Sequence, residues 1–256
     1  YPAHEARHLR GSGFLVPLGA AFVNETTVFR EFGPLAGRTM RLGYNVAPKI
    51  GSTLSRQTFE ADLRYYQRLA TSGVLALRFR GFKSSGSFPD FLYFGGNSEM
   101  RGYDYLSFVG QNATFANAEL RFPIIEAALT PIGVIGGIRG VFFANVGGGW
   151  FNSQDYTFAT SKAETYTPIV GYDFDLLGNA SPVAGDPRTI SGFRLRDGRA
   201  SYGLGLETFA LGFPIHFDWS WRTLLNKDWE DALFASSGGS SAFRKARFAV
   251  WIGYDF

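Results

Sequence analysis

Apolar and polar side chains alternate with a period of two along much of this chain. Between Thr58 and Arg68, the odd positions carry apolar or aromatic side chains, namely Phe59, Ala61, Leu63 and Tyr65. The even positions are mostly charged, namely Glu60, Asp62, Arg64, Tyr66 and Arg68. Because successive side chains of a β-strand point to opposite faces, this segment has one apolar and one polar face. Several such strands in one chain predict a transmembrane β-barrel with a wet lumen.

The alternation and the turn residues between its segments predict nine strands of an all-β, antiparallel barrel wall. Their ranges are 14–32, 38–47, 58–68, 74–83, 113–123, 137–150, 199–211, 213–223 and 243–256. Bacterial single-chain barrels have an even number of strands. We therefore expect that strands are missing at the N-terminus, or that residues 1–13 hold part of one.

The predicted connections alternate between short and long. The shorter ones are 33–37, 69–73, a moderate one at 124–136 and a tight turn at Gly212. The longer ones are 48–57, 84–112, 151–198 and 224–242. Outer-membrane barrels alternate in this way because their periplasmic turns are short and their extracellular loops are long. A soluble β-sandwich has no reason to sort its loops by length. The order of short and long connections places residue 256 on the periplasmic side.

Composition narrows the class of protein. Hydrophobic residues make up 45% of the 256 residues and aromatic residues 17%, yet the mean hydropathy is only -0.05. No segment approaches the roughly 20 consecutive apolar residues that a helical membrane span requires. The small net charge of +3 argues against nucleic acid binding, and the absence of cysteine suits a protein that crosses an oxidising periplasm. The first residues lack signal-peptide features, so we expect a cleaved leader or a longer parent chain.

Residues 94–105 read Phe-Gly-Gly-Asn-Ser-Glu-Met-Arg-Gly-Tyr-Asp-Tyr. This segment resembles the BamA/TamA superfamily, the bacterial surface antigen barrels, in which an Arg-Gly-Phe/Tyr tripeptide lies on a long loop that folds back into the lumen. The tripeptide matches Arg101, Gly102 and Tyr103. Residues 33–38, 75–80, 118–123 and 252–256 also resemble parts of that family. Its barrel has 16 strands, five of them after the lumenal loop, as predicted here. The resemblance implies that residues 1–256 are the C-terminal part of a transmembrane barrel, without its N-terminal strands and any periplasmic domain.

The same resemblance implies a latch in the lumen, formed by Arg101, Gly102 and Tyr103. Arginine offers a planar cation to acids of the barrel wall, and glycine permits a tight backbone turn. In the family a Phe-x-Asp-x-Gly element supplies the receiving carboxylate. Residues 143–147 have Asn145 at that place, and an amide lacks the charge-assisted pairing of a carboxylate. The candidate latch partners are the lumenal residues Glu119, Asn145, Glu207 and Asp218.

The end of the chain resembles the terminal signal that the barrel assembly machinery reads during biogenesis. The residues of this predicted signal are Phe248, Val250, Ile252, Gly253, Tyr254 and Phe256. In the family the first and last strands pair poorly, which opens a gate where client strands can add by β-augmentation. We expect 243–256 to be one strand of such a gate.

The function that the resemblance implies is the insertion of outer-membrane proteins or the translocation of proteins, in the outer membrane of a Gram-negative-type cell. The expected partners are outer-membrane lipid and lipopolysaccharide, client outer-membrane or secreted proteins, and the barrel assembly machinery. Nucleic acid and cofactors are not expected. An anchor or pore barrel of the same ancestry, attached to a periplasmic domain of another function, and a diffusion porin remain alternatives.

An outer-membrane hydrolase is the third alternative. His216, Asp218 and Ser220 share one predicted lumenal face. Residues two apart on a strand are separated by about 6.6 Å, which is too far for a nucleophile to bond to its base. Three histidines without ligand spacing do not predict a metal site. We therefore expect that the protein is not an enzyme.

Overall fold

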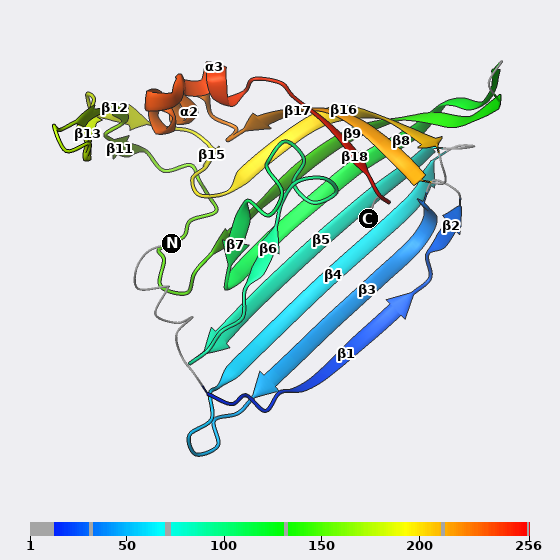
Figure 1. Ribbon diagram of the computed structural model, residues 1–256, viewed down its shortest axis with the longest axis horizontal. Coiled ribbons are helices and arrows are strands. Elements are labelled where there is room, and N and C mark those ends of the chain that lie inside the picture. Colours follow the sequence, from blue (N-terminus) through cyan, green and yellow to red (C-terminus); the bar gives the residue numbers. More distant parts are fainter. Residues whose placement is uncertain (1–12, 31–32, 70–72, 131–132, 211–212, 255) are drawn as a thin grey trace.

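The computed structural model describes residues 13–30, 33–69, 73–130, 133–210, 213–254 and 256. One antiparallel sheet dominates it, with strands paired in the order β1-β3-β4-β5-β8-β9-β16-β17-β18. Their bounds are Leu18–Glu25 (β1), Gly33–Ala47 (β3), Arg56–Leu69 (β4), Gly73–Gly86 (β5), Asn112–Thr130 (β8), Gly133–Trp150 (β9), Arg199–Ala210 (β16), Phe213–Thr223 (β17) and Arg247–Ile252 (β18). A short strand β2, Val28–Arg30, also pairs with β3. Figure 1 shows β16, β17 and β18 curling over the antiparallel strands β1, β3, β4, β5, β8 and β9.

This architecture confirms the predicted all-β, antiparallel barrel wall. The paired strands end at β1 on one side and β18 on the other, and these two do not pair with each other in the described residues, so the sheet is not closed. Short links at 31–32, 70–72, 131–132 and 211–212 alternate with long ones at 48–55, 87–111, 151–198 and 224–246. Because neighbouring strands are antiparallel, the short links all lie at one end of the wall.

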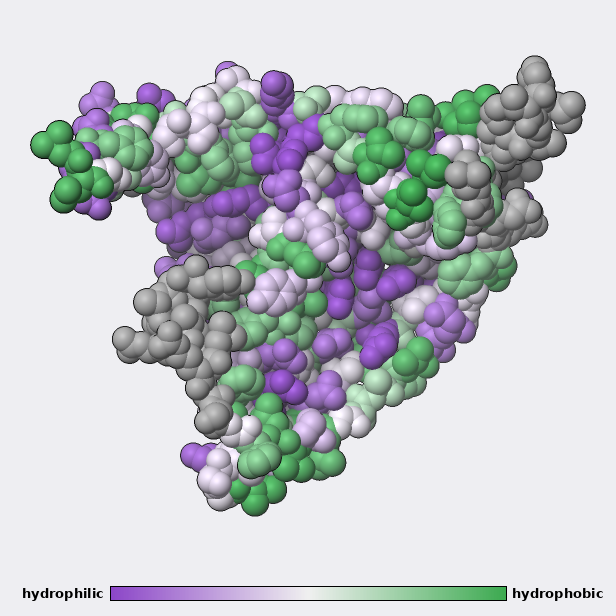
Figure 2. Space-filling view, viewed as in Figure 1, coloured by the Kyte–Doolittle hydropathy of each residue, from purple (hydrophilic) through white to green (hydrophobic). Residues whose placement is uncertain are grey.

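The wall has the two faces that the alternation predicts. Phe59 is 48% exposed, whereas the neighbouring Thr58 is 4% exposed. Exposed apolar side chains cover the outward face, among them Tyr44, Leu63, Tyr65, Phe79, Phe142, Tyr202, Leu204, Phe248 and Val250. Buried polar side chains lie on the inward face, among them Arg78, Asn117, Glu119, Arg121, Asn145, Glu207, His216 and Asp218. Figure 2 shows hydrophilic residues gathered on the inward side, which also carries the hairpin of β6, Leu92–Phe94, and β7, Phe108–Gly110 (Figure 1).

Two predicted boundaries near the short links were wrong. The predicted strand 14–32 is interrupted between β1 and β2. There Gly37 of β3 has φ +106°, and an added Cβ would lie 2.3 Å from the carbonyl oxygen of Thr26. Residues 124–136 were predicted as a connection, but 124–130 lengthen β8 and 133–136 lengthen β9. Pairing resumes after a bulge between Pro123 and Ile125, so the apolar run belongs to a long hairpin.

The predicted strand 243–256 was also too long, because its first residues belong to a helical loop. Asn226 caps the helix α2, Lys227–Leu233, by accepting a hydrogen bond from the backbone N–H of Trp229. The one-turn η1, Ala235–Ser237, and the short α3, Gly239–Phe243, follow. Phe243 packs into a core with Trp229 and Leu224, so β18 begins only at Arg247. Among the described residues, no helix is long and apolar enough to cross a membrane.

Residues 151–198 and 224–246 together form what we call the loop cap. The first segment folds into three small antiparallel pairs, namely β10 (Ala159–Thr160) with β15 (Arg194–Leu195), β11 (Glu164–Tyr166) with β14 (Arg188–Ile190), and β12 (Ile169–Phe174) with β13 (Ala180–Ala184). Ile190 and Leu195 of this segment share the Trp229 core with the helical segment. A hydrogen bond from Ser240 holds the pKa of the Asp231 carboxyl below its usual value and ties α3 to α2.

Candidate functional site

The loop between β5 and β8 folds back over the inward face of the sheet, because its own apolar residues pack there. It contains a hairpin of β6, Leu92–Phe94, and β7, Phe108–Gly110. Phe94 and Met100 are fully buried and pack against Phe115 of the wall. The Phe94 ring stacks on Phe108 and on Phe115, each with a centroid distance of 5.0 Å. This apolar cluster holds the tripeptide 101–103 against the wall.

Arg101 is the centre of the site and is 2% exposed. Its Nη2 lies 2.8 Å from Glu119 Oε1 of β8, and its Nη1 lies 3.6 Å from Asp218 Oδ1 of β17. Its guanidinium also lies over the rings of Phe143 of β9, at 4.6 Å, and Trp251 of β18, at 5.6 Å. Cation–π contacts and carboxylates together stabilise a buried cation. One side chain therefore joins four strands of the wall.

Gly102 and Tyr103 fix the backbone around this arginine. Gly102 has φ +85°, and an added Cβ would lie 2.9 Å from Ser220 Oγ, so only glycine fits without displacement. The hydroxyl of Tyr103 donates to the carbonyl oxygen of Ala200 at 3.1 Å. Its ring meets Phe108 edge to face at 5.1 Å. The three residues of the tripeptide thus make three different kinds of contact with the wall.

The candidate partners divide into two groups. Glu119 and Asp218 lie beside the guanidinium of Arg101. Glu119 also binds Arg121, with 2.7 Å between Oε2 and Nη2, and Asp218 accepts a 2.7 Å hydrogen bond from the indole of Trp251. Glu207 instead pairs with Arg139 and faces Nδ1 of His216 at 3.2 Å.

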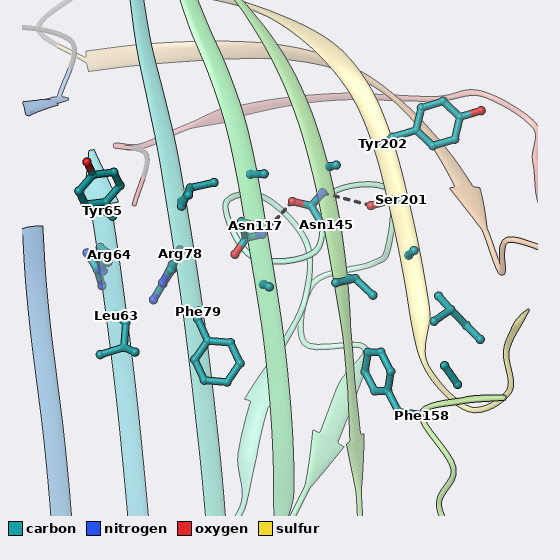
Figure 3. Close-up of a pocket in the computed structure, with 18 of the residues that line it drawn as sticks. Leu63, Arg64, Tyr65, Arg78, Phe79, Asn117, Asn145, Phe158, Ser201 and Tyr202 are labelled. Carbon is teal, nitrogen blue, oxygen red and sulfur yellow. Dashed lines mark hydrogen bonds between the residues drawn. The ribbon is translucent and has the colours of Figure 1, made fainter. Parts of the chain in front are cut away.

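Asn145 holds the backbone of the loop through its neighbours. Its Oδ1 accepts from Asn117 Nδ2 at 2.8 Å, and its Nδ2 donates to Ser201 Oγ at 3.1 Å (Figure 3). Ser201 Oγ in turn donates to the carbonyl oxygen of Arg101 at 2.5 Å, and Asn117 donates to the carbonyl oxygen of Glu99. The amide in place of the family's carboxylate therefore belongs to a polar ladder beneath residues 99–101.

The loop also binds β18, a contact that the sequence analysis missed. Arg247 donates through Nη1 to the carbonyl oxygen of Gly102 at 3.1 Å, and its Nη2 lies 2.6 Å from Asp104 Oδ1. Farther along β18, the Trp251 ring lies flat on His216, with centroids 3.6 Å apart. Alternation with the outward Phe248, Val250 and Ile252 would have placed Arg247 and Trp251 on the inward face. A cavity of about 190 Å³ remains between the loop and β18.

The residues of the predicted terminal signal lie in two environments. Phe248, Val250, Ile252 and Tyr254 are 54–63% exposed on the outward face. Phe256 is 4% exposed and packs against Tyr66, Val74 and Ala76 of β4 and β5. Gly253, with φ +154°, lies between these environments, and its carbonyl oxygen is 2.7 Å from Nε2 of His216.

Several other inward charges, and the three residues of the hydrolase alternative, have structural partners. Asp62 pairs with Arg64 at 2.8 Å and with Arg78 at 2.9 Å. Arg80 pairs with Glu99 at 3.4 Å. Ser220 Oγ donates to the carbonyl oxygen of Arg247 at 3.3 Å, while His216 and Asp218 bond as described above. Across the part of the chain that the structure describes, no group of three or more His, Asp or Glu side chains is placed to hold a metal ion.

Comparison with known proteins adds one finding. The model of the Omp85 superfamily domain matches residues 25–256. No curated protein matches the chain. The matched range includes the lumenal loop and all four strands that contact Arg101, β18 among them.

Proposed function

Because this chain belongs to the Omp85 superfamily of outer-membrane barrels, we propose that it inserts proteins into the outer membrane or translocates them across it. The observation that supports this most is the contact between the lumenal loop and β18. β18 pairs with β17, and among the described strands none pairs with its other edge. The free N–H and C=O groups of a strand edge can accept a strand of another protein by β-augmentation.

The lumenal loop braces β18 at two points along its length. At its start, Arg247 binds the backbone of Gly102 and the carboxylate of Asp104. Toward its end, Trp251 lies beneath the guanidinium of Arg101 and donates to Asp218. A shift of the loop therefore changes the support of the strand that would receive a client. In this mechanism the resting loop holds β18 in place, and displacement of the loop lets β18 move so that its edge can receive the client strand.

Burial makes the resting position of the loop well defined. The side chains of Arg101 and Glu119 are 2% and 1% exposed, and separating a buried pair costs about 3–5 kcal/mol because each charge loses its partner. Small thermal shifts do not supply that free energy. Contacts made by a client strand have to offset it, which couples opening of the edge to the presence of a client.

Insertion of an unfolded outer-membrane barrel protein into vesicles that contain the full natural protein tests this function. Folded client is measured over time by its heat-modifiable gel mobility. We expect Arg101→Ala to speed insertion at least tenfold, because opening no longer requires the buried Arg101–Glu119 pair to separate. Arg101→Lys should have an intermediate effect, because a lysine lacks the planar fork that two carboxylates require. Arg196→Ala, which removes a loop-cap arginine 3.3 Å from Glu164, serves as the matched control.

Wild-type insertion by a correctly folded Arg101→Ala protein would overturn the proposal. An anchor barrel of the same ancestry predicts no client insertion by any of these proteins. A diffusion porin predicts a steady, large conductance of the intact protein in planar bilayers, which is incompatible with a loop held across the lumen. Ser220→Ala leaves insertion unchanged under our proposal, whereas a hydrolase that used Ser220 would lose its ester or peptide hydrolysis.

A further inference from the structure

An apolar groove of about 1000 Å³ crosses the outward face of the wall, on the side opposite the lumenal loop (Figure 3). It runs across β3, β4, β5, β8, β9 and β16, from Arg38 to Tyr202. Three alanines line its middle, namely Ala116, Ala118 and Ala144. Arg101, Gly102 and Tyr103 are not among the residues that line the groove, so it is separate from the latch tripeptide.

The groove exists because small side chains lie in register between large ones. Ala118 pairs with Leu77 on one side and with Ala144 on the other, and Ala144 pairs with Tyr202. Leu77 and Tyr202 are 38% and 51% exposed and stand at either side of the alanines. The methyl groups of Ala118 and Ala144 are small, so a depression remains above them, between Leu77 and Tyr202. Figure 3 shows Phe79 and Phe158 at its margins.

The loop cap closes one end of the groove. Phe158, Phe193 and Leu225, all from the loop cap, line it together with the wall. Phe193 and Leu225 are 55% and 52% exposed, so their apolar surface is available to a ligand in the groove. At the end of the groove near β16, both the wall and the loop cap therefore present apolar side chains.

The opposite end carries a positive charge. Arg38 lines the groove there, is exposed, and pairs in register with Tyr65. The hydroxyl of Tyr65 donates to Gln67 at 2.6 Å, so polar groups gather at this end. An arginine on a lipid-facing surface is costly unless its guanidinium reaches the headgroup level. Arg38 therefore marks a site for an anionic headgroup.

The distance from Arg38 to the alanines fits one leaflet of a bilayer. Arg38 on β3 and Ala118 on β8 are separated by three interstrand steps of about 4.8 Å, or roughly 14 Å in all. That is close to half of a hydrocarbon core of about 30 Å. Arg38 lies near the short-link end of β3, and Tyr202 lies near the long-link end of β16, so the groove runs from the short-link side toward the long-link side.

We propose that the groove binds one phospholipid of the leaflet on the short-link side, with its phosphate at Arg38 and an acyl chain over Ala118 and Ala144. The site goes beyond the proposed function and rests only on the location of the barrel in the outer membrane. A bound lipid would fill the depression and join the wall to the loop cap.

The experiment measures phospholipid retained by the full natural protein after extraction from its membrane and repeated detergent exchange, using native mass spectrometry. We expect one phospholipid per wild-type protein. Ala118→Phe and, independently, Ala144→Leu should each abolish retention by filling the groove. Arg38→Gln should weaken retention of an anionic phospholipid about fivefold, because one cation near a membrane surface contributes a modest attraction.

Two variants outside the groove are matched controls. Ala20→Phe enlarges another small residue, on β1, in register with the outward Tyr44. Lys83→Gln removes another outward cation, in register with Phe59. Both should retain the lipid, and heat-modifiable mobility checks the folding of every variant. Equal retention by wild type and Ala118→Phe, or loss in all variants alike, would show annular lipid only and overturn the proposal. A co-purifying protein lost from Ala118→Phe, with lipid unchanged, would also overturn it.

Discussion

Among the arginine–carboxylate pairs that hold the lumenal loop, Arg101–Glu119 and Arg247–Asp104 have sharply different surroundings. The pair Arg101–Glu119 lies at 2.8 Å with side chains 2% and 1% exposed. The pair Arg247–Asp104 lies at 2.6 Å with side chains 38% and 76% exposed. The exposed pair is the shorter one, so distance does not rank them. Burial does, because water and salt screen the outer pair, whereas loss of one inner partner leaves an uncompensated buried charge.

The inner pair, Arg101–Glu119, and the outer pair, Arg247–Asp104, have different roles. The inner pair sets where the loop rests. Its carboxylate also binds Arg121, which lies 2.7 Å from the second oxygen of Glu119. The outer pair connects the same loop to the start of β18 by a contact that is cheap to break. Displacement of β18 can therefore begin at Asp104 before Arg101 moves. The following variants test this difference, from the largest expected effect to the smallest.

Glu119→Ala should have the largest effect. It leaves Arg101 and Arg121 buried without their shared carboxylate, and we expect a loss of about 3–5 kcal/mol in the free energy of unfolding. Urea unfolding in lipid vesicles measures it. Glu60→Ala removes another inward glutamate, only half-buried on β4, and should change stability by no more than about 0.5 kcal/mol. Equal effects of the two variants would contradict the special role of the inner pair.

Gly102→Ala should come next, because it strains the backbone between the two pairs. A side chain at φ +85° and a contact of 2.9 Å with Ser220 Oγ together should cost about 1–3 kcal/mol. The expected readout is faster proteolysis within residues 96–106. Gly51→Ala is the control, since Gly51 has φ +59° with no atom within 4 Å of an added Cβ.

The double variant Gly102→Ala/Ser220→Gly separates crowding from backbone strain. It should recover part of the protease resistance but not all of it, because the positive φ remains. Full recovery would show that the backbone conformation of Gly102 is not strained for alanine. No recovery would show that the close approach to β17 is unimportant.

The alternation of residues predicted the wall well because every second side chain of a strand points to the same face. The inward positions of Glu119 and Asp218 follow from this alternation alone. The alternation does not say which loop residue meets which strand, so the contacts of Arg247 with Gly102 and Asp104 could not be predicted. The tripeptide 101–103 came from resemblance to a family and not from periodicity.

Local patterns failed where tertiary packing decides the structure. The helix α2, which follows β17, has only 7 residues, and its stability depends on the Asn226 cap and on burial of Trp229. An isolated helix of this length is unstable in water, so its sequence reads as loop. For Asn145, the family pattern predicted an arginine partner, whereas the structure gives it Asn117 and Ser201.

Asn145→Asp tests this polar ladder and should have an intermediate effect. Ser201 Oγ donates to the carbonyl oxygen of Arg101 and accepts from Asn145 Nδ2. A carboxylate cannot donate, so two acceptors would face each other, at an expected cost of about 1–3 kcal/mol. Urea unfolding measures the effect, with Asn45→Asp on the exposed part of β3 as the control. A stabilising effect would mean that the new carboxylate pairs with Arg101 and that the ladder is dispensable.

Asp104→Asn should have the smallest effect on stability, no more than about 1 kcal/mol, because the outer pair is exposed. Its value as a test lies in salt dependence. Raising the ionic strength from 0.1 to 1 M shortens the Debye length from about 10 Å to about 3 Å. Amide hydrogen exchange of β18 should therefore quicken with salt in the wild type and be insensitive to salt in Asp104→Asn. Exchange of residues around Glu119 should not respond in either protein. A salt response at Glu119 would show that the inner pair is hydrated, and the two pairs would then differ in position but not in kind.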